Sequence, residues 1–219
     1  MPGRRGATDG ATATARESTG LAKGTVIIGG GQAGLSAAAE LRKRKYAAPV
    51  TLLCGEAVPP YQRPPLSKAY LSGETPLDRL WLKPESYYEA AGVTVRTDAR
   101  ATAIDRARCE VITEDGARLG YDDLILATGG EARRPPIPGA QLEGVHVLRT
   151  LAEADALSQA LEQADTLVII GAGYIGLEVA ASARKRGKAV VVLEASERPM
   201  ARTASALVSG LFGAIHRGY

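Results

Sequence analysis

Cysteine is scarce in this sequence, and its scarcity excludes several classes of protein. Only Cys54 and Cys109 occur among the 219 residues. Two cysteines this far apart form no disulfide framework, and they lack the spacing of a cysteine-based metal site. His146 and His216 are equally isolated, so we expect no bound metal ion. So few cysteines are typical of a reducing compartment, which predicts a cytoplasmic protein.

Long apolar runs and a strong net charge are absent as well. No run approaches the ~20 apolar residues that a transmembrane helix needs, so the sequence predicts no membrane span. The formal net charge is only +3. Basic residues do not gather in a stripe with interleaved aromatic side chains, so we expect no nucleic-acid partner. Residues 1–23 lack the apolar segment of a secretory signal, and their composition predicts a disordered leader.

Glycine, by contrast, is abundant, and two glycine-rich turns follow short apolar runs. A β-branched run at Thr25–Ile28 leads into glycines, a helical pattern over Gln32–Arg44 and a second apolar run at Pro49–Cys54. The stretch "TLVIIGAGYIGLEVAASARKRGKAVVVLEASERP" has the same order, and Val168–Gly171 repeats Val26–Gly29 letter for letter. The sequence therefore predicts an α/β fold with two Rossmann-like dinucleotide-binding units.

Both turns have the spacing G-x-G-x-x-G, which binds a dinucleotide when it stands between a strand and a helix. The first glycine permits the sharp turn, the second admits the pyrophosphate, and the third lets the helix pack on the strand. The amides of Ala33 and Ile175 are placed to face a phosphate. The glycines are Gly29, Gly31 and Gly34 in the first turn and Gly171, Gly173 and Gly176 in the second.

An acidic residue follows the second strand of each unit. Glu56 and Glu194 stand where a carboxylate accepts hydrogen bonds from ribose hydroxyls. Glu194 favours NAD over NADP, because a carboxylate repels a 2′-phosphate, although the nearby Arg198 leaves NADP open. Two dinucleotide sites in one chain predict hydride transfer between FAD and NAD(P)H.

The chain between the two turns has a different pattern. Three short alternating runs and the hairpin signal Asp115-Gly116 predict a small antiparallel β insertion. The runs are Val93–Arg96, Ala101–Asp105 and Cys109–Thr113. A strand at Leu124–Ala127 and a helix at Leu151–Gln163 follow. We expect the first segment of an FAD-binding domain at 24–140 and the N-terminal part of an NAD-binding domain, with an incomplete second unit, at 141–219.

A proline-rich segment, "PPYQRPPLSKAYL" at Pro59–Leu71, stands shortly after Glu56. Proline fixes φ and removes a backbone donor. We expect the prolines to present Arg63 and Lys68 on a stiff segment without a local helix.

Five motifs carry a resemblance to a known family. They are "VIIGGGQAGLSAA", "YQRPPLSKAYL", "LILATGGEARRPPIPG", "LRTLAEAD" and "LVIIGAGYIGLEVA". In this order they resemble the FAD-dependent pyridine nucleotide–disulfide oxidoreductase superfamily, and within it the ferredoxin reductases of the putidaredoxin, rhodocoxin and rubredoxin reductase type. The resemblance implies bound FAD, NAD(H) as substrate, and electron transfer to a 2Fe-2S ferredoxin or a rubredoxin that serves an oxygenase or cytochrome P450 system.

The resemblance also implies roles for individual residues. Ala33 and Glu56 bind the FAD pyrophosphate and ribose, Ala101 contacts the adenine side, and Thr128 and Gly129 approach the cofactor. Arg63, Lys68 and Arg149 lie beside the flavin, and Glu178 projects toward the nicotinamide and pairs with Lys68. Lys68 and Glu178 are therefore the expected catalytic residues, and a cation there favours the anionic reduced flavin. Plain alternatives stay open: a solvated Lys68, an ordinary ion pair at Arg149 and a surface carboxylate at Glu178.

Within the resembled superfamily, the lack of a redox cysteine pair distinguishes this chain from the disulfide reductases. Disulfide reductases of this superfamily carry a redox C-x4-C pair after the first glycine-rich turn, where this chain has Tyr61–Lys68. Electrons then leave the flavin one at a time or pass to oxygen, which favours a ferredoxin or rubredoxin acceptor. The alternatives are an NADH oxidase or nitrite-reductase-like enzyme, an apoptosis-inducing-factor-like flavoprotein, and a remnant with weak or no flavin binding.

Proteins of the resembled type are considerably longer than this chain. The sequence stops at "LFGAIHRGY", inside the helix expected after the second unit. By resemblance, later strands of the NAD domain, a returning flavin-binding segment and a C-terminal interface domain are missing. We therefore expect a fragment or truncated gene product that lacks a full complement of flavin when purified.

Overall fold

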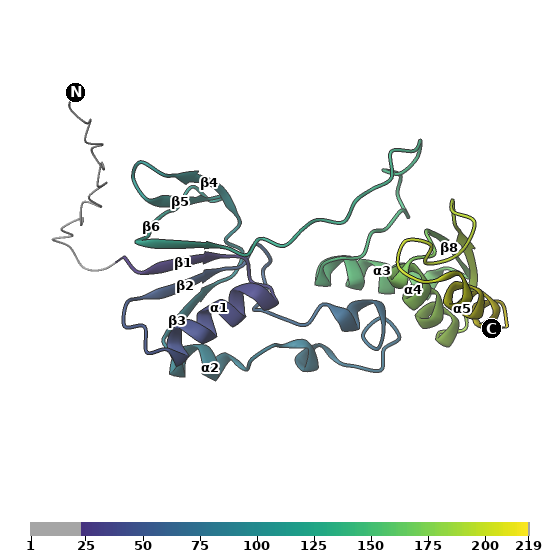
Figure 1. The fold of residues 1–219 in the computed structure, drawn as a ribbon, viewed down its shortest axis with the longest axis horizontal. Helices are drawn as coiled ribbons and strands as arrows, with labels where there is room; N and C mark the ends of the chain where they lie inside the picture. Colours follow the sequence, from purple (N-terminus) through teal and green to yellow (C-terminus); the bar gives the residue numbers. More distant parts are fainter. Residues whose placement is uncertain (1–22, 219) are drawn as a thin grey trace, which may run out of the picture.

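The computed structural model describes residues 23–218. Of the leader predicted for residues 1–23, all but Lys23 lies outside the described residues. The first part of the chain forms a parallel sheet with the strand order β3-β2-β1-β7 (Figure 1). Its strands are β1 (Thr25–Ile28), β2 (Val50–Leu53), β3 (Val93–Arg96) and β7 (Asp123–Leu126).

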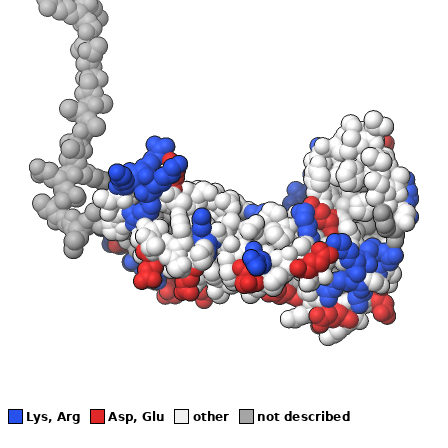
Figure 2. All heavy atoms as spheres, turned by 90° about the horizontal axis from the view of Figure 1, so that it is seen from below, with Lys and Arg blue, Asp and Glu red and all other residues white. Residues whose placement is uncertain are grey.

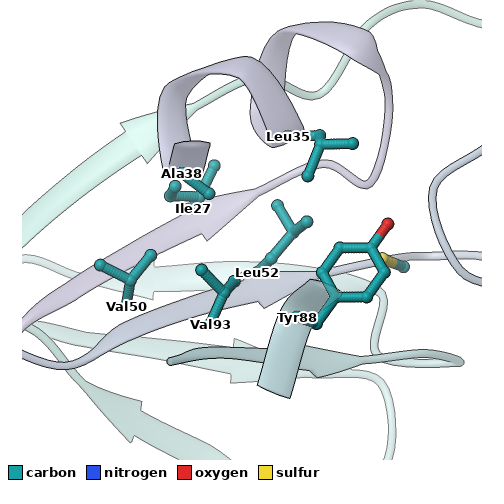
Figure 3. Packing of buried hydrophobic residues seen from close by; sticks show 8 residues of the cluster. Ile27, Leu35, Ala38, Val50, Leu52, Tyr88 and Val93 are labelled. Carbon is teal, nitrogen blue, oxygen red and sulfur yellow. The ribbon is translucent and has the colours of Figure 1, made fainter. Parts of the chain in front are cut away.

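Helices α1 (Gln32–Lys43) and α2 (Glu85–Ala90) cover one face of this sheet. Figure 3 shows aliphatic side chains of the strands packing beneath α1, with Tyr88 of α2 beside them. Each fully buried aliphatic side chain stabilises the fold by about 1.5–3 kcal/mol. This face therefore holds the glycine-rich turn between β1 and α1 rigidly. The labelled side chains are Ile27, Leu35, Ala38, Val50, Leu52, Tyr88 and Val93.

An antiparallel sheet covers the opposite face, as predicted, but Val93–Arg96 does not belong to it: this run pairs in parallel with β2 as strand β3. The order of the antiparallel sheet is β4-β5-β6, and Val111 of β5 is buried against Val26, Ile28 and Leu53 of the parallel sheet. The strands are β4 (Ala101–Asp105), β5 (Glu110–Thr113) and β6 (Arg118–Gly120). The turn at Asp115-Gly116 joins β5 to β6, with Gly116 at φ +81°.

The second part of the chain repeats the strand, turn, helix and strand order. Strands β8 (Thr166–Ile170) and β9 (Ala189–Leu193) pair in parallel, with α4 (Tyr174–Lys185) between them in sequence. Helix α3 (Leu151–Gln163) precedes this unit and begins with a capping box between Thr150 and Glu153. The predicted α/β architecture with two Rossmann-like units is confirmed.

One face of the second unit is exposed and apolar. Strands β8 and β9 alternate between half-buried side chains and exposed ones. Helix α5 (Ala206–Arg217) also presents apolar side chains to solvent, with Leu207 85% exposed. Figure 2 shows few charged atoms over a lobe at this end of the molecule, while basic and acidic residues are interspersed elsewhere on that face. The exposed strand residues are Val168, Ile170, Val191 and Leu193.

The proline-rich segment departs from the prediction, because it contains a short helix. Pro64–Ser67 forms a 3₁₀ turn, η1, and Leu77–Leu80 forms a second one, η2. Proline at the first helical positions has its φ already set and has no amide to leave unpaired, so the prolines start this turn rather than prevent it. The amide of Lys68 closes the turn by donating to the carbonyl of Pro65 at 2.9 Å.

The same segment connects the two units (Figure 1). Leu66 of η1 packs with Leu151 and Ala154 of α3. Leu71 is buried against α3 and against Val179 of α4. Among residues 23–218, no helix is both long and apolar enough to span a bilayer.

Candidate functional site

The first glycine-rich turn is shaped by close backbone approaches. Gly29 has φ +124°, and a Cβ there would lie 2.0 Å from the carbonyl oxygen of Ala127. A Cβ on Gly34 would lie 1.9 Å from the carbonyl oxygen of Gly29. A Cβ on Gly31 would meet nothing within 4 Å. Gly29 and Gly34 are therefore required by packing, whereas Gly31 keeps open the space in front of the α1 N-terminus.

That space is a cavity of about 1150 Å³ at the carboxyl edge of the parallel sheet. Ordinary small-molecule pockets have volumes of ~300–1,000 Å³, so this cavity is large enough for a ligand of more than usual size. Most residues predicted to bind FAD line it, while Gly34 packs behind it and Lys68 lies in a neighbouring cavity. The predicted residues it brings together are Gly29, Gly31, Ala33, Glu56, Arg63, Ala101, Thr128, Gly129 and Arg149.

Glu56 lies at the end of β2 in a hydrogen-bonded network. Its Oε1 accepts from Arg63 Nη2 at 2.6 Å, and its Oε2 accepts from the Tyr61 hydroxyl at 2.7 Å. Arg63 Nη1 donates to the carbonyl oxygen of Arg149 at 2.7 Å. The guanidinium of Arg63 therefore binds Glu56 and connects it to the chain entering α3. Its predicted place beside the flavin stays a prediction.

Tyr61 is a residue that sequence reasoning missed. Its side chain is 4% exposed, and its hydroxyl also accepts from the amide of Leu151 at 2.8 Å. Burial, followed by the hydrogen bond to Glu56, raises the pKa of the Tyr61 hydroxyl far above its usual range, so it stays a neutral donor. The only signal in the sequence was a tyrosine flanked by prolines two residues before Arg63.

Lys68 and Glu178 form an ion pair across the junction of the two units. Lys68 Nζ lies 2.8 Å from Glu178 Oε2, so the predicted pairing is confirmed. Ser67 Oγ donates to the same oxygen at 2.6 Å. Burial acts to raise the pKa of Glu178, but hydrogen bonds from Lys68 and Ser67 and the charge of Lys68 outweigh it, so the pKa is lowered. Glu178 is thus held as a carboxylate.

The pair lines a smaller cavity of about 300 Å³. Arg63 and Arg149 line both this cavity and the larger one, so the two are neighbours. Ile175 and Tyr174, in the first turn of α4, complete the wall on the side of the second unit. Tyr174 is 55% exposed and was not singled out from the sequence, because one aromatic residue at a helix start carries no distinctive pattern.

The second glycine-rich turn repeats the geometry of the first. Gly171 has φ +105°, and a Cβ on Gly176 would lie 2.1 Å from the carbonyl oxygen of Gly171. A Cβ on Gly173 would meet nothing within 4 Å, so this position is open in front of α4, as Gly31 is in front of α1.

Glu194 closes this turn from the end of β9. Its Oε2 accepts from the amide of Ala172 at 2.7 Å, and its Oε1 accepts from the amide of Ser196 at 2.8 Å. The bonds from Ser196 and Ala172 lower the pKa of Glu194, so it is a carboxylate near neutral pH. Arg198 donates to the carbonyls of Ala204 and Ala201, which directs its guanidinium into its own loop.

The cysteines do not form a redox pair. Cys54 is 2% exposed, and burial together with the charge of Glu56 raises the pKa of its thiol to about 11. Such a thiol is almost wholly protonated at neutral pH and is a poor nucleophile. Cys109 lies in the antiparallel sheet region at φ +53°. Residues 23–218 hold no cluster of three metal-binding side chains.

Two parallel sheets, each with a glycine-rich turn and an acidic residue at its carboxyl edge, define a protein with two dinucleotide-binding units. A family model described as pyridine nucleotide-disulphide oxidoreductase matches residues 23–217. The chain belongs to this family, whose members use FAD and NAD(H).

Similar proteins include several reductases of small electron carriers. The chain is 48% identical to rhodocoxin reductase of Rhodococcus erythropolis over 191 residues, which is 87% of this chain and 45% of that protein. It is 42% identical to rubredoxin-NAD(+) reductase of Pseudomonas putida, covering 85% of this chain and 48% of that protein. The solved structure of a ferredoxin reductase for the CYP199A2 system from Rhodopseudomonas palustris matches with a TM-score of 0.84 and 39% identity, over 89% of this chain and 48% of that one. The chain thus spans less than half the length of these relatives.

Proposed function

We propose that this chain carries the nucleotide-binding units of an NADH-dependent FAD flavoprotein reductase of the cytoplasm. Residues 24–140 bind FAD, residues 141–219 bind NAD(H), and electrons pass to a 2Fe-2S ferredoxin or a rubredoxin that serves an oxygenase or cytochrome P450 system. The observation that carries the proposal is the Lys68–Glu178 ion pair of 2.8 Å between the two units.

The position of this pair supports hydride transfer between two bound nucleotides. Lys68 follows η1, next to the cavity that begins at the first glycine-rich turn. Glu178 lies on α4, one turn after the second glycine-rich turn. Nucleotides held at these two turns would extend toward the cavity that the pair lines. When bound, FAD accepts a hydride from NADH and passes the electrons on.

The residues of this chain bind and orient the nucleotides. Gly31 and Gly173 admit the two pyrophosphates to the helix N-termini, where free amides and the helix dipole favour phosphate. Glu56 and Glu194 accept hydrogen bonds from ribose hydroxyls. The Lys68 ammonium favours negative charge on the flavin side of the smaller cavity, and Glu178 holds that ammonium in place.

Two observations support a one-electron carrier as the acceptor. The described residues contain no dithiol beside the cavities, and the buried, protonated Cys54 cannot accept electrons from the flavin as half of a disulfide. The relatives named above are reductases of rhodocoxin, rubredoxin and a ferredoxin. Glu194 and the engaged guanidinium of Arg198 favour NADH over NADPH.

The test is binding of the two nucleotides, followed by electron transfer. Calorimetric titration with FAD and then with NADH is expected to give saturable heats for each, and Gly31→Val is expected to abolish FAD binding only. Under anaerobic conditions NADH bleaches the bound flavin, and oxidised 2Fe-2S ferredoxin or rubredoxin restores its colour. A chain that binds neither nucleotide contradicts the proposal, and one whose reduced flavin reacts with dioxygen but with neither carrier indicates an NADH oxidase instead.

A further inference from the structure

Helix α4 is hydrogen-bonded along one face to the segment that carries Lys68. Glu178, Ser182 and Arg186 are spaced four residues apart, so they lie on the same side of the helix. Glu178 accepts from Ser67 Oγ at 2.6 Å, and Arg186 Nη1 donates to the carbonyl oxygen of Leu71 at 3.2 Å. Three successive turns of the second unit thus contact residues 67–71 of the first.

Ser182 occupies the middle of this contact. Its side chain is 4% exposed, and its hydroxyl donates to the carbonyl oxygen of Ser67 at 2.8 Å. The carbonyl oxygen of Lys68 lies 3.3 Å from the same hydroxyl. One side chain therefore contacts the main chain on both sides of the Lys68 Cα.

We propose that Ser182, together with Ser67, is a positioning residue that holds the Lys68 ammonium against Glu178. Ser182 fixes the main chain of residues 67 and 68, and Ser67 fixes the carboxylate that Lys68 binds. Because a buried carbonyl that loses its donor must seek another, removal of the hydroxyl releases the end of η1. Lys68 then samples positions away from Glu178.

The arrangement also connects the NAD side to the flavin side. The N-terminus of α4 carries Gly173, and the same rigid helix carries Glu178 and Ser182. A displacement of α4 when a nucleotide binds at its N-terminus moves both hydrogen-bonding partners of the Lys68 segment together. The importance of Lys68 rests on the proposed function, whereas the positioning itself depends only on the contacts of this chain.

The test measures Lys68 directly, without any nucleotide. Acetic anhydride must reach the lone pair of the amine, so the rate of acetylation reports how often the Lys68 side chain leaves its 2.8 Å contact with Glu178. Acetylation of Lys68 in the folded chain, followed by peptide mass spectrometry, is expected to be about fivefold faster in Ser182→Ala, the factor that corresponds to one lost hydrogen bond. The pKa of Glu178, followed by carboxyl NMR, is expected to move toward the ordinary glutamate value. The substitution is expected to leave the positions of Arg63 and Arg149, which line the same cavity, unchanged.

The matched control is Ser158→Ala, which removes a serine from the same interface. Ser158 Oγ accepts from Arg186 Nη1 at 2.9 Å rather than bonding to the Lys68 segment, so Lys68 is expected to react at the parent rate. Ser182→Cys, which keeps the side-chain volume with a weak donor, provides the same measurement if the alanine variant does not fold. An unchanged rate in the Ser182 variant, or an equal rise in Ser158→Ala, overturns the proposal. Failure of FAD or NADH binding overturns the proposed function and leaves this result standing.

Discussion

At the scale of single residues, each ion pair of the site is supported by a neighbouring hydroxyl. Sequence reasoning identified Glu56 from its spacing after the first glycine-rich turn, Arg63 and Lys68 from the proline-rich segment, and Glu178 from the family resemblance. It identified neither hydroxyl. The Ser67–Glu178 bond joins residues 111 positions apart, and the Tyr61–Glu56 bond crosses an irregular turn that no sequence period encodes. The Glu56–Arg63 pair is supported by the hydroxyl of Tyr61, and the Glu178–Lys68 pair by the hydroxyl of Ser67.

Replacing Lys68 by methionine tests its charge. In the FAD-bound chain, Lys68→Met is expected to lower the flavin reduction potential by about 30 mV, because the reduced, negatively charged flavin loses a nearby cation. Spectroelectrochemical titration gives the potential. Lys83→Met is the control, since the Lys83 ammonium lies over the Tyr87 ring at 4.9 Å on α2. A potential that is the same in Lys68→Met and the parent contradicts the assigned role.

The lowered pKa of Glu178 predicts a dependence of stability on pH. A carboxyl whose pKa is lower in the folded than in the unfolded chain contributes stability above the unfolded value and loses it as pH falls through the folded value. Glu178→Gln is expected to lower the free energy of unfolding by about 1 kcal/mol at neutral pH. Below pH ~4, where the unfolded carboxyl is protonated, the difference is expected to shrink.

Urea unfolding at several pH values measures this difference. Glu74→Gln is the matched control on the same interface, because Glu74 pairs with Lys185 at 2.7 Å but both side chains are more than half exposed. Its effect is expected to be small at every pH, since solvent screens exposed pairs. A Glu178→Gln difference that grows on acidification rules out the ion pair as the source of stability.

At the scale of elements, the strand, turn and helix units follow from short-range rules. Strands β1 and β3 and helix α3 occupy the ranges that their patterns predict. Sequence reasoning did not identify β6, because three residues are too few for a period to be recognised. It also expected a stiff segment at Pro59–Leu71 without a helix, whereas Pro64 and Pro65 start a 3₁₀ turn that aims Lys68 at α4.

Two glycines of the first turn are expected to have different roles, Gly34 in packing and Gly31 in ligand binding. Gly34→Ala is expected to destabilise the fold by about 3 kcal/mol, because its Cβ would lie 1.9 Å from the carbonyl oxygen of Gly29 and the helix must move. Gly31→Ala is expected to leave the thermal midpoint almost unchanged and to weaken FAD binding, because its Cβ enters the open space. Thermal unfolding and calorimetry measure the two effects. Equal destabilisation by both substitutions contradicts this division.

At the scale of the whole molecule, the two units are joined by the segment that follows β2. This segment contributes to the cavity of the first unit, and it packs on α3 and α4 of the second (Figure 1). From the sequence, the pairing of Lys68 with Glu178 could be predicted only through the family resemblance. Their meeting requires that the Lys68 segment cross to the second unit, which depends on the burial of Leu66 and Leu71.

The exposed apolar face of the second unit predicts hydrophobic association. Large contiguous apolar patches are unusual on soluble monomers. The chain is expected to bind the dye ANS, and Leu207→Glu, at a position 85% exposed on α5, is expected to reduce the dye fluorescence. Leu142→Glu is the control, because Leu142 is 63% exposed but lies in a loop outside this face. Equal reductions by both substitutions contradict a binding surface formed by α5, β8 and β9.

The sequence by itself determined the class of fold, the two glycine-rich turns and the acidic residues that follow them. Each of these depends on residues close together in the chain, so spacing and periodicity are sufficient to predict them. Only the tertiary structure decided that Arg63 binds Glu56, that Tyr61 and Ser67 support the two pairs, and that Ser182 contacts the main chain of Lys68. The contacts of Ser67 and Ser182 join residues more than 100 positions apart, and they form because the segment between Glu56 and α2 packs against α3 and α4. Arg63 and Tyr61 are close to Glu56 in the chain, but they reach it across an irregular turn that no sequence period encodes.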